Sequence, residues 1–232
     1  MGLPKEVVDN DDEHGFEMIE KKECAAETIL LAGVSKELLG ARLDYAIARG
    51  SIEEVSSAAR AGTSEEQNSR GLVLAAMHGR ADCVELLIPL SDIEIVGGQA
   101  VQIAAKGNRV DVLKALLGAG ANAKSHKSYA LALAAGKGHF KCVELLIPRS
   151  NPAAENSRAL LWAVEGGCMD CVRALLPLSD PLALSDGEMS PRAAAMAKEK
   201  WSIVELFDAH CERIELERSV AAGARQASGL RL

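Results

Sequence analysis

The sequence predicts an all-α fold in which five to six helix–turn–helix repeats stack as a solenoid with helical caps. One observation behind this is the phrase "CVELLIP", which occurs at residues 83–89 and again at residues 142–148. Another is composition, since 48% of the residues are hydrophobic but only 3% are aromatic. A core built mainly of Ala, Leu, Val and Ile suits closely packed helices better than a sheet sandwich. The third is the placement of Gly and Pro at fixed positions in the copies.

The repeat has a period of about 29 residues, which is typical of stacked repeat architectures. A weaker earlier copy lies at residues 45–60 and a weaker later copy at residues 195–210. One unit cannot bury its apolar side alone, so successive units must bury it against each other. The copies align on one position that recurs at intervals of 29, 30 and 29 residues: Cys83, Val112, Cys142 and Cys171.

The first helix of each unit is predicted by apolar residues at i, i+3 and i+4, such as Leu72, Ala75 and Ala76. The paired alanines allow neighbouring backbones to approach closely. We expect this helix to end at a residue that tolerates the left-handed conformation. The residues at that position are Gly79, Asn108, Gly138 and Gly167.

The second helix repeats the same spacing at Val84, Leu87 and Ile88. A proline is expected to end it, because the residue before a proline disfavours the helical region. Ser-Asp or Ser-Asn follows and favours a turn that starts the connection to the next unit. The three prolines are Pro89, Pro148 and Pro177.

The two ends of the chain are expected to differ from the repeats. A helix from Ile203 is expected to run past Glu217. Repeat stacks need capping elements at their ends, and chain termini often fray. We therefore expect four segments: a disordered acidic N-terminus at 1–15, an N-terminal capping helix or half repeat at 16–39, the solenoid at 40–212, and a C-terminal helix end with a frayed tail at 213–232.

Several motifs together resemble a known repeat family. The stretch "AAGKGHFKCVELL" contains an Ala pair, Gly138-His139, Val143 and a Leu-Leu pair. The stretch "ALLGAGA" at residues 115–121 contains a Leu-Leu-x-x-Gly-Ala close, and Ser190-Pro191 is similar to a Thr-Pro start. In these features the chain resembles ankyrin repeats over roughly residues 40–210.

The chain also departs from the ankyrin pattern. Its period is shorter than the family's period of about 33 residues. Pro-Ser-Asp or Pro-Ser-Asn replaces the Gly-Ala close in some copies, so we expect the β-hairpin loops to be shortened or absent. Glu199 stands where a glycine is expected in the last copy.

The resemblance implies a non-catalytic protein–protein interaction module that binds its partner on the concave face of the stack, as an adaptor, scaffold or inhibitor. In ankyrin-like proteins the positions just after the Ala pair face partners. Those positions give the candidate partner-binding residues: Arg49, Met77, His78, Lys106, Lys137, Glu165 and Lys198.

Two further features bear on this surface. Arg49, Lys106, Lys137 and Lys198 make a largely basic row, which would suit an acidic segment of the partner and raise the association rate more than the affinity. Trp162 stands where other copies have a smaller apolar residue. It is either a core residue or an aromatic anchor for a partner, and we include it among the candidates.

Cys168 and Cys171 have the Cys-x-x-Cys spacing of zinc or redox sites. No second pair follows at zinc-finger spacing, and Cys171 belongs to the repeating position of Cys83 and Cys142, where a cysteine acts as a small apolar residue. Core packing is the favoured interpretation, and we expect no metal site. A metal- or thiol-regulated protein that uses Cys168 and Cys171 stays open as an alternative function.

Catalysis has no candidate residues. Glycine-rich stretches at residues 118–123 and 136–141 follow predicted helices, whereas a dinucleotide fingerprint follows a strand. None of the five histidines belongs to a nucleophile–base constellation. We therefore expect no enzyme activity and no cofactor.

Charge and targeting signals set the remaining expectations. The formal net charge is −7, and residues 1–24 contain eight acidic residues against three lysines. Without a large basic patch, an apolar run of about 18 residues or a signal peptide, we expect neither nucleic-acid nor membrane binding. Six cysteines in a chain of this length do not resemble a disulfide scaffold. We expect an intracellular, cytoplasmic monomer, and delivery into a host cell as a microbial effector stays open.

Overall fold

The computed structural model describes residues 36–184 and 189–229. These residues fall into two compact units that divide between Asp92 and Ile93. The acidic N-terminus expected at residues 1–15 lies outside the described residues, as does most of the cap expected at 16–39.

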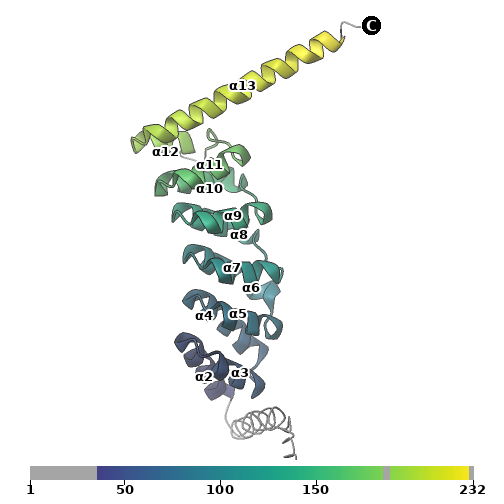
Figure 1. Cartoon of the computed structure of the whole chain (residues 1–232), viewed down its shortest axis with the longest axis vertical. Helices are drawn as coiled ribbons and strands as arrows, with labels where there is room; N and C mark the ends of the chain where they lie inside the picture. The colour runs from purple at the N-terminus through teal and green to yellow at the C-terminus, as the bar shows by residue number, and fades with distance from the viewer. Residues whose placement is uncertain (1–35, 185–188, 230–232) are drawn as a thin grey trace, which may run out of the picture. The chain divides into compact units, whose positions relative to one another are not determined.

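Unit 1, the part before the division, contains two helix pairs (Figure 1). Each pair consists of a first helix and a shorter second helix that packs against it, and the two first helices also pack against each other. The elements are α2 (Lys36–Arg49), α3 (Ile52–Arg60), α4 (Glu65–His78), α5 (Ala81–Leu87) and η1 (Ile88–Leu90), the last being a 3₁₀ turn.

Unit 2, the part after the division, continues the same arrangement with four pairs. The first helices α6, α8, α10 and α12 pack in succession, and the second helices α7, α9 and α11 do the same, so the unit has two layers (Figure 1). Its elements are α6 (Ile93–Lys106), α7 (Val110–Gly118), α8 (Ser125–Gly136), α9 (Phe140–Leu146), η2 (Ile147–Arg149), α10 (Ala154–Gly166), α11 (Met169–Leu175), η3 (Leu176–Leu178), α12 (Pro191–Ala197) and α13 (Trp201–Gly229).

The all-α prediction is confirmed, and no β-strand occurs within residues 36–184 and 189–229. Compact turns connect the pairs in place of β-hairpins. A buried serine of a first helix accepts a hydrogen bond from the main-chain N–H of the residue that begins the next repeat. These pairs are Ser69 with Asp92 (3.0 Å), Ser128 with Asn151 (2.8 Å) and Ser157 with Asp180 (2.9 Å).

Left-handed residues follow the first helices, as predicted. Gly79, Gly138 and Gly167 have φ of 73°, 74° and 75°, and Asn108 has φ of 55°. Glu199 has φ of 54°. The last copy therefore keeps the repeat register although its residue at this position is not glycine.

The prolines lie where the second helices end, but the predicted reason is wrong. Ile88, directly before Pro89, stays in the helical region with φ −49° and ψ −53°. The α-helix instead tightens into a 3₁₀ turn whose early positions accept proline, because their N–H groups would have no partner within the turn. The chain becomes extended only at Ser91, and η2 and η3 end their helices in the same way.

The core of each unit is built from the predicted small apolar positions. The Ala75–Ala76 pair is fully buried, as is the Ala104–Ala105 pair of unit 2. On the second helices, Cys83, Cys142 and Cys171 are at most 2% exposed, which is the small apolar role expected of them.

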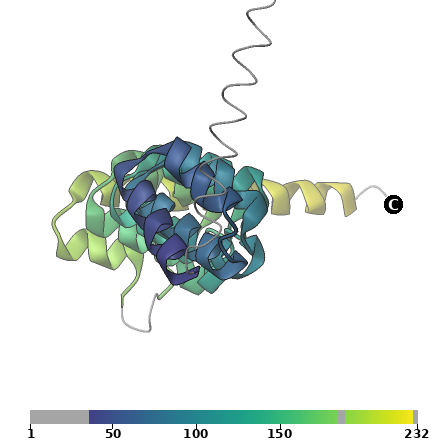
Figure 2. The ribbon, with the colours of Figure 1, turned by 90° about the horizontal axis from the view of Figure 1, so that it is seen from below.

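The second helix of the last pair, α13, is far longer than the others. Ile203, Val204 and Phe207 at its start are buried within unit 2, whereas residues 215–222 are exposed. Its later part extends beyond the helix pairs of the unit (Figures 1 and 2). The helix expected from Ile203 past Glu217 thus spans Trp201–Gly229.

Candidate functional site

The candidate residues share one structural place. Apart from Trp162, each lies in the last turn of a first helix or directly after it, and each of these is exposed to solvent. Trp162 lies one turn earlier on α10 and is half-buried. The structure brings Arg49, Met77 and His78 into unit 1, and Lys106, Lys137, Trp162, Glu165 and Lys198 into unit 2.

In unit 1, local contacts hold the candidate arginine. The Arg49 guanidinium lies 5.7 Å from the centre of the Tyr45 ring and 3.7 Å from a carboxylate oxygen of Glu54. The side chains of Arg49 and Glu54 are 58% and 35% exposed, so the ion pair is worth little. Met77 is 53% exposed, and so offers apolar surface beside His78.

In unit 2, we call Lys106, Lys137, Glu165 and Lys198 the helix-end row. Among the described residues, no carboxylate lies within ion-pair distance of its three lysines. Their charges lie at the carboxyl ends of first helices, where the helix dipole favours a cation. Three lysines against one glutamate leave the row positive although the whole chain is acidic.

A second set of residues hydrogen-bonds to these helix ends and was not predicted from the sequence. In three repeats the residue after the left-handed position, Arg80, His139 or Lys200, reaches back to carbonyls in the last turn of the preceding first helix, where helix carbonyls lack their usual partners. The Nζ of Lys200 donates to Val164 and Glu165 at 2.6 and 3.1 Å. Within unit 1, Arg80 donates to the carbonyls of Ala48 and Arg49, both at 3.4 Å.

The imidazole Nε2 of His139 makes the equivalent contact, 3.1 Å from the Lys106 oxygen. No such role was predicted from the sequence for Arg80 or Lys200. The residue type at this position varies between copies, so a comparison of the copies alone does not show that it has one function.

Trp162 packs against an aromatic neighbour on the preceding first helix. Its ring meets the Tyr129 ring edge to face, with centroids 5.5 Å apart and an interplanar angle of 72°. Both rings are half-buried, so they form the side of the first-helix layer and still offer apolar surface. Of the two sequence interpretations of Trp162, the structure supports a mixture: the ring is packed on one side and open on the other.

Glycines bring α8 and α10 close together beside this pair. A Cβ atom added at Gly166 would collide with the carbonyl oxygen of Gly136, and one added at Gly136 would lie 3.2 Å from the Cβ of Trp162. Both glycines border candidate partner-binding residues, Lys137 and Glu165. In the structure they are packing residues.

A groove of about 440 Å³ lies between α6 and the start of α8. Gln102 Nε2 lies 2.9 Å from His126 Nδ1 within it. Sequence analysis did not predict this groove. The residue that could have indicated it is Gly98, which stands where other copies have a serine. Because glycine has no side chain, there is room at this position for Ser125.

Cys168 and Cys171 lie together at the start of α11. The main-chain N–H of Cys171 donates to the Cys168 sulfur at 3.3 Å. Cys171 is fully buried, and burial, followed by the hydrogen bond with Cys168, raises the pKa of its thiol. In the described part of the chain, no group of three or more His, Cys, Asp or Glu side chains is arranged to hold a metal ion.

Comparison with protein families supports the repeat pattern. The family model described as ankyrin repeats (3 copies) matches residues 101–183, which run from within α6 to beyond η3. No curated protein matches the sequence significantly. Separately, none of the helices in the described ranges combines the length and apolar character needed to cross a bilayer.

Proposed function

We propose that the chain is a non-catalytic adaptor, scaffold or inhibitor that binds an acidic segment of a partner. The match of residues 101–183 to ankyrin repeats, which generally mediate protein–protein interaction, supports this role. The binding surface proposed in unit 2 is the helix-end row together with Trp162. The observation that carries this proposal is the set of three exposed lysines, each at an equivalent helix end and each without a carboxylate in ion-pair distance among the described residues.

The energetics of the row favour this use. An exposed lysine that already pairs with a carboxylate gains little from a partner, whereas an unpaired one gains attraction at the cost of little desolvation. Lysines spaced by successive repeats would attract an extended acidic segment and speed its association. The half-buried Trp162 would supply an apolar anchor beside them, of the kind that dominates binding energy in many interfaces.

The experiment compares the native chain with a Lys106→Glu, Lys137→Glu, Lys198→Glu variant as bait for proteins from a cell extract. A matched control carries Lys114→Glu, Lys124→Glu and Arg173→Glu, which reverse the same number of exposed charges in unit 2 away from the row. Circular dichroism checks that helix content is equal in all three. Any captured protein is then purified and its affinity measured at two salt concentrations.

The proposal predicts that one partner binds the native chain and the control but loses at least about tenfold in affinity for the row variant at low salt. The loss should shrink as salt rises, because screening weakens the native interaction first. A partner that binds all three chains equally would place the binding surface elsewhere on the molecule.

A further inference from the structure

Cys168 and Cys171 each occupy a position that recurs in other repeats. Cys171 occupies the buried second-helix position of Cys83 and Cys142. Cys168 occupies the position at which Arg80, His139 and Lys200 reach back to the preceding repeat, as described above. In that role Cys168 is a poor substitute, since its sulfur lies 3.9 Å from the Gly138 carbonyl oxygen. The repeat architecture therefore accounts for Cys171 but gives no reason for a thiol at residue 168.

A hydrogen bond already joins the two cysteines. Cys168 is the N-cap residue of α11, with an extended backbone at φ −82° and ψ 96°, and its sulfur accepts the N–H of Cys171 at 3.3 Å. This contact places the Cys168 sulfur over the first turn of α11, beside the residue that carries the second thiol. Residues three apart on a helix lie on the same side of it, which is the arrangement that a disulfide within this turn needs.

The environments of the two thiols decide which of them meets a dissolved oxidant first. Cys168 is partly open to solvent, whereas Cys171 is completely buried. Burial raises the pKa of the Cys171 thiol, so it stays protonated and shielded from a dissolved oxidant. Thiols that sense oxidants are typically accessible and stand next to a second, resolving cysteine.

We propose that Cys168 and Cys171 form a peroxide-oxidisable dithiol, in which Cys168 reacts first and Cys171 resolves it into a disulfide within α11. Hydrogen peroxide transfers one oxygen to the Cys168 sulfur, giving a sulfenic acid and one water. The Cys171 sulfur then attacks the Cys168 sulfur, and its proton leaves with the hydroxyl group as a second water. The two thiols lose two electrons in total, which the peroxide accepts.

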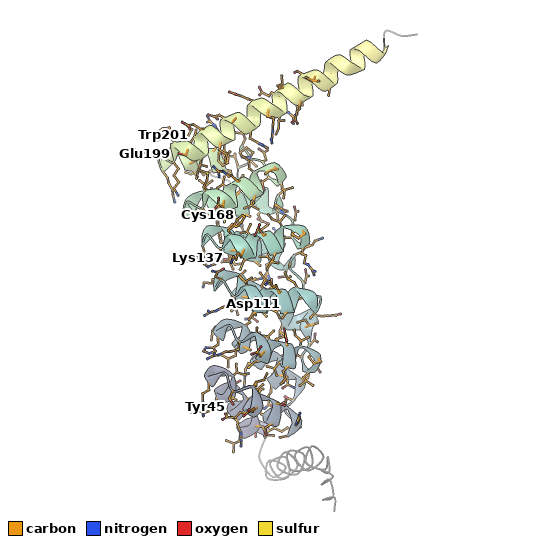
Figure 3. All side chains as sticks on the ribbon, in the orientation of Figure 1. Tyr45, Asp111, Lys137, Cys168, Glu199 and Trp201 are labelled. Atoms are coloured by element: carbon orange, nitrogen blue, oxygen red, sulfur yellow. The ribbon has the colours of Figure 1, made fainter. Side chains whose placement is uncertain are left out.

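The inference does not depend on the proposed partner. Figure 3 shows Cys168 on the same edge of unit 2 as Lys137 and Glu199, so an oxidant in solution reaches it as readily as a binding protein would. The chemistry is a property of the free chain, and a failure to find any partner would leave it unaffected.

The test treats the reduced full chain with one equivalent of hydrogen peroxide, alkylates the remaining thiols, digests with trypsin and analyses the peptides by mass spectrometry. Cleavage after Arg158 and Arg173 leaves both cysteines on one peptide, residues 159–173. The expected product is that peptide without alkylation and lighter by the mass of two hydrogen atoms. The buried Cys83 and Cys142 on other peptides serve as internal controls and should stay alkylated.

Two variants assign the roles. Cys168→Ser keeps an N-cap side chain that α11 accepts, and it should leave Cys171 reduced under the same peroxide. Cys171→Ala should stop the reaction at the Cys168 sulfenic acid, which a cyclic 1,3-dione traps as an adduct. Circular dichroism of both variants checks that they remain folded.

Three outcomes would overturn the proposal. The peptide 159–173 could keep both thiols while the Cys83 or Cys142 peptide is oxidised. The Cys168 sulfur could pass to the sulfinic acid in the native chain without forming the disulfide. The disulfide could also join two chains, which non-reducing electrophoresis would show as a dimer.

Discussion

The side-chain nitrogen of Lys200 lies 2.6 Å from the main-chain oxygen of Val164, in the preceding repeat. That carbonyl belongs to the last turn of α10, where it also accepts the N–H of the capping residue Gly167 at 3.1 Å. Lys200 binds the second lone pair of this oxygen. His139 makes the corresponding contact one repeat earlier. A side chain of one repeat therefore completes the hydrogen bonding of the repeat before it, and stacking adds polar contacts to the burial of apolar surface.

Lys200→Met tests the energetic weight of this contact. The change keeps most of the aliphatic stem but removes both hydrogen bonds, to Val164 and Glu165. The free energy of unfolding should fall by about 1–2 kcal/mol, as is usual for hydrogen bonds from a charged group. Urea denaturation followed by circular dichroism gives the value. Lys198→Met, which removes an exposed charge nearby, should change stability by less than about 0.5 kcal/mol. Equal effects of the two changes would contradict this role of Lys200.

Glu199→Gly should make the protein more stable. Glu199 is exposed and has φ of 54°, in a region where a non-glycine residue is strained. Glycine occupies this position in four other repeats with φ of 73–79° and carries no such strain. We expect the free energy of unfolding to rise by about 1 kcal/mol. The reverse experiment, Gly138→Ala, should lower it by a similar amount, and thermal unfolding measures both. No gain in the glycine variant would mean that Glu199 is not strained.

The repeat structure was predictable because it depends on local rules. The i, i+3, i+4 spacing of Leu72, Ala75 and Ala76 fixed the buried side of a first helix, and a glycine after it fixed the helix end. Both signals act within a few residues of sequence, so one copy confirmed another. Residues 101–183 match ankyrin repeats, the family that these signals resemble.

The missed features depend on contacts between repeats. Lys200 and Val164 are 36 residues apart in sequence, and the amino-acid type at the reaching position changes from Arg to His to Cys to Lys. The collision that keeps residue 166 a glycine likewise comes from Gly136, on another helix. A pattern within one copy contains no information on such contacts. The 3₁₀ turns at the prolines were missed for a different reason. The residue before a proline usually avoids the helical region, but here the 3₁₀ turn keeps that residue helical.

Gly166→Ala should be strongly destabilising although Gly166 is exposed to solvent. The added methyl would collide with the Gly136 carbonyl oxygen, and this partner is backbone that cannot rotate away. Pushing α8 and α10 apart would also disturb the packing of Trp162 on Tyr129. We expect a loss of about 1–3 kcal/mol in the free energy of unfolding.

The control for this change is Gly118→Ala, at the end of α7. Nothing lies within 4 Å of a Cβ built there, and its φ is not positive. Alanine should therefore leave stability unchanged or raise it by up to about 1 kcal/mol. Chemical denaturation of the two variants side by side gives the comparison. If both alanines had the same effect, the close approach of α8 and α10 would not limit residue 166.

An ion pair between α12 and α13 should make stability depend on acid. Arg192 Nε and one terminal nitrogen lie 2.8 and 3.2 Å from the two carboxylate oxygens of Asp208. This bidentate contact holds the pKa of Asp208 below its ordinary value of 3.8. The native state therefore binds fewer protons than the unfolded state near that pH. The stabilisation is present above the ordinary pKa and is lost as the pH falls through the native value.

Arg192→Met should remove this dependence. In the variant, the Asp208 carboxylate loses its hydrogen-bonding partner, so its pKa should rise toward the ordinary value, as seen by NMR titration of the side chain. The fall in stability between about pH 5 and pH 2 should then be shallower than in the native chain. Asp208→Asn should flatten the curve to the same extent, and the double variant should add nothing further. A native Asp208 that titrates at its ordinary pKa, or an unchanged pH profile in Arg192→Met, would show that this pair does not link α12 to α13 in solution.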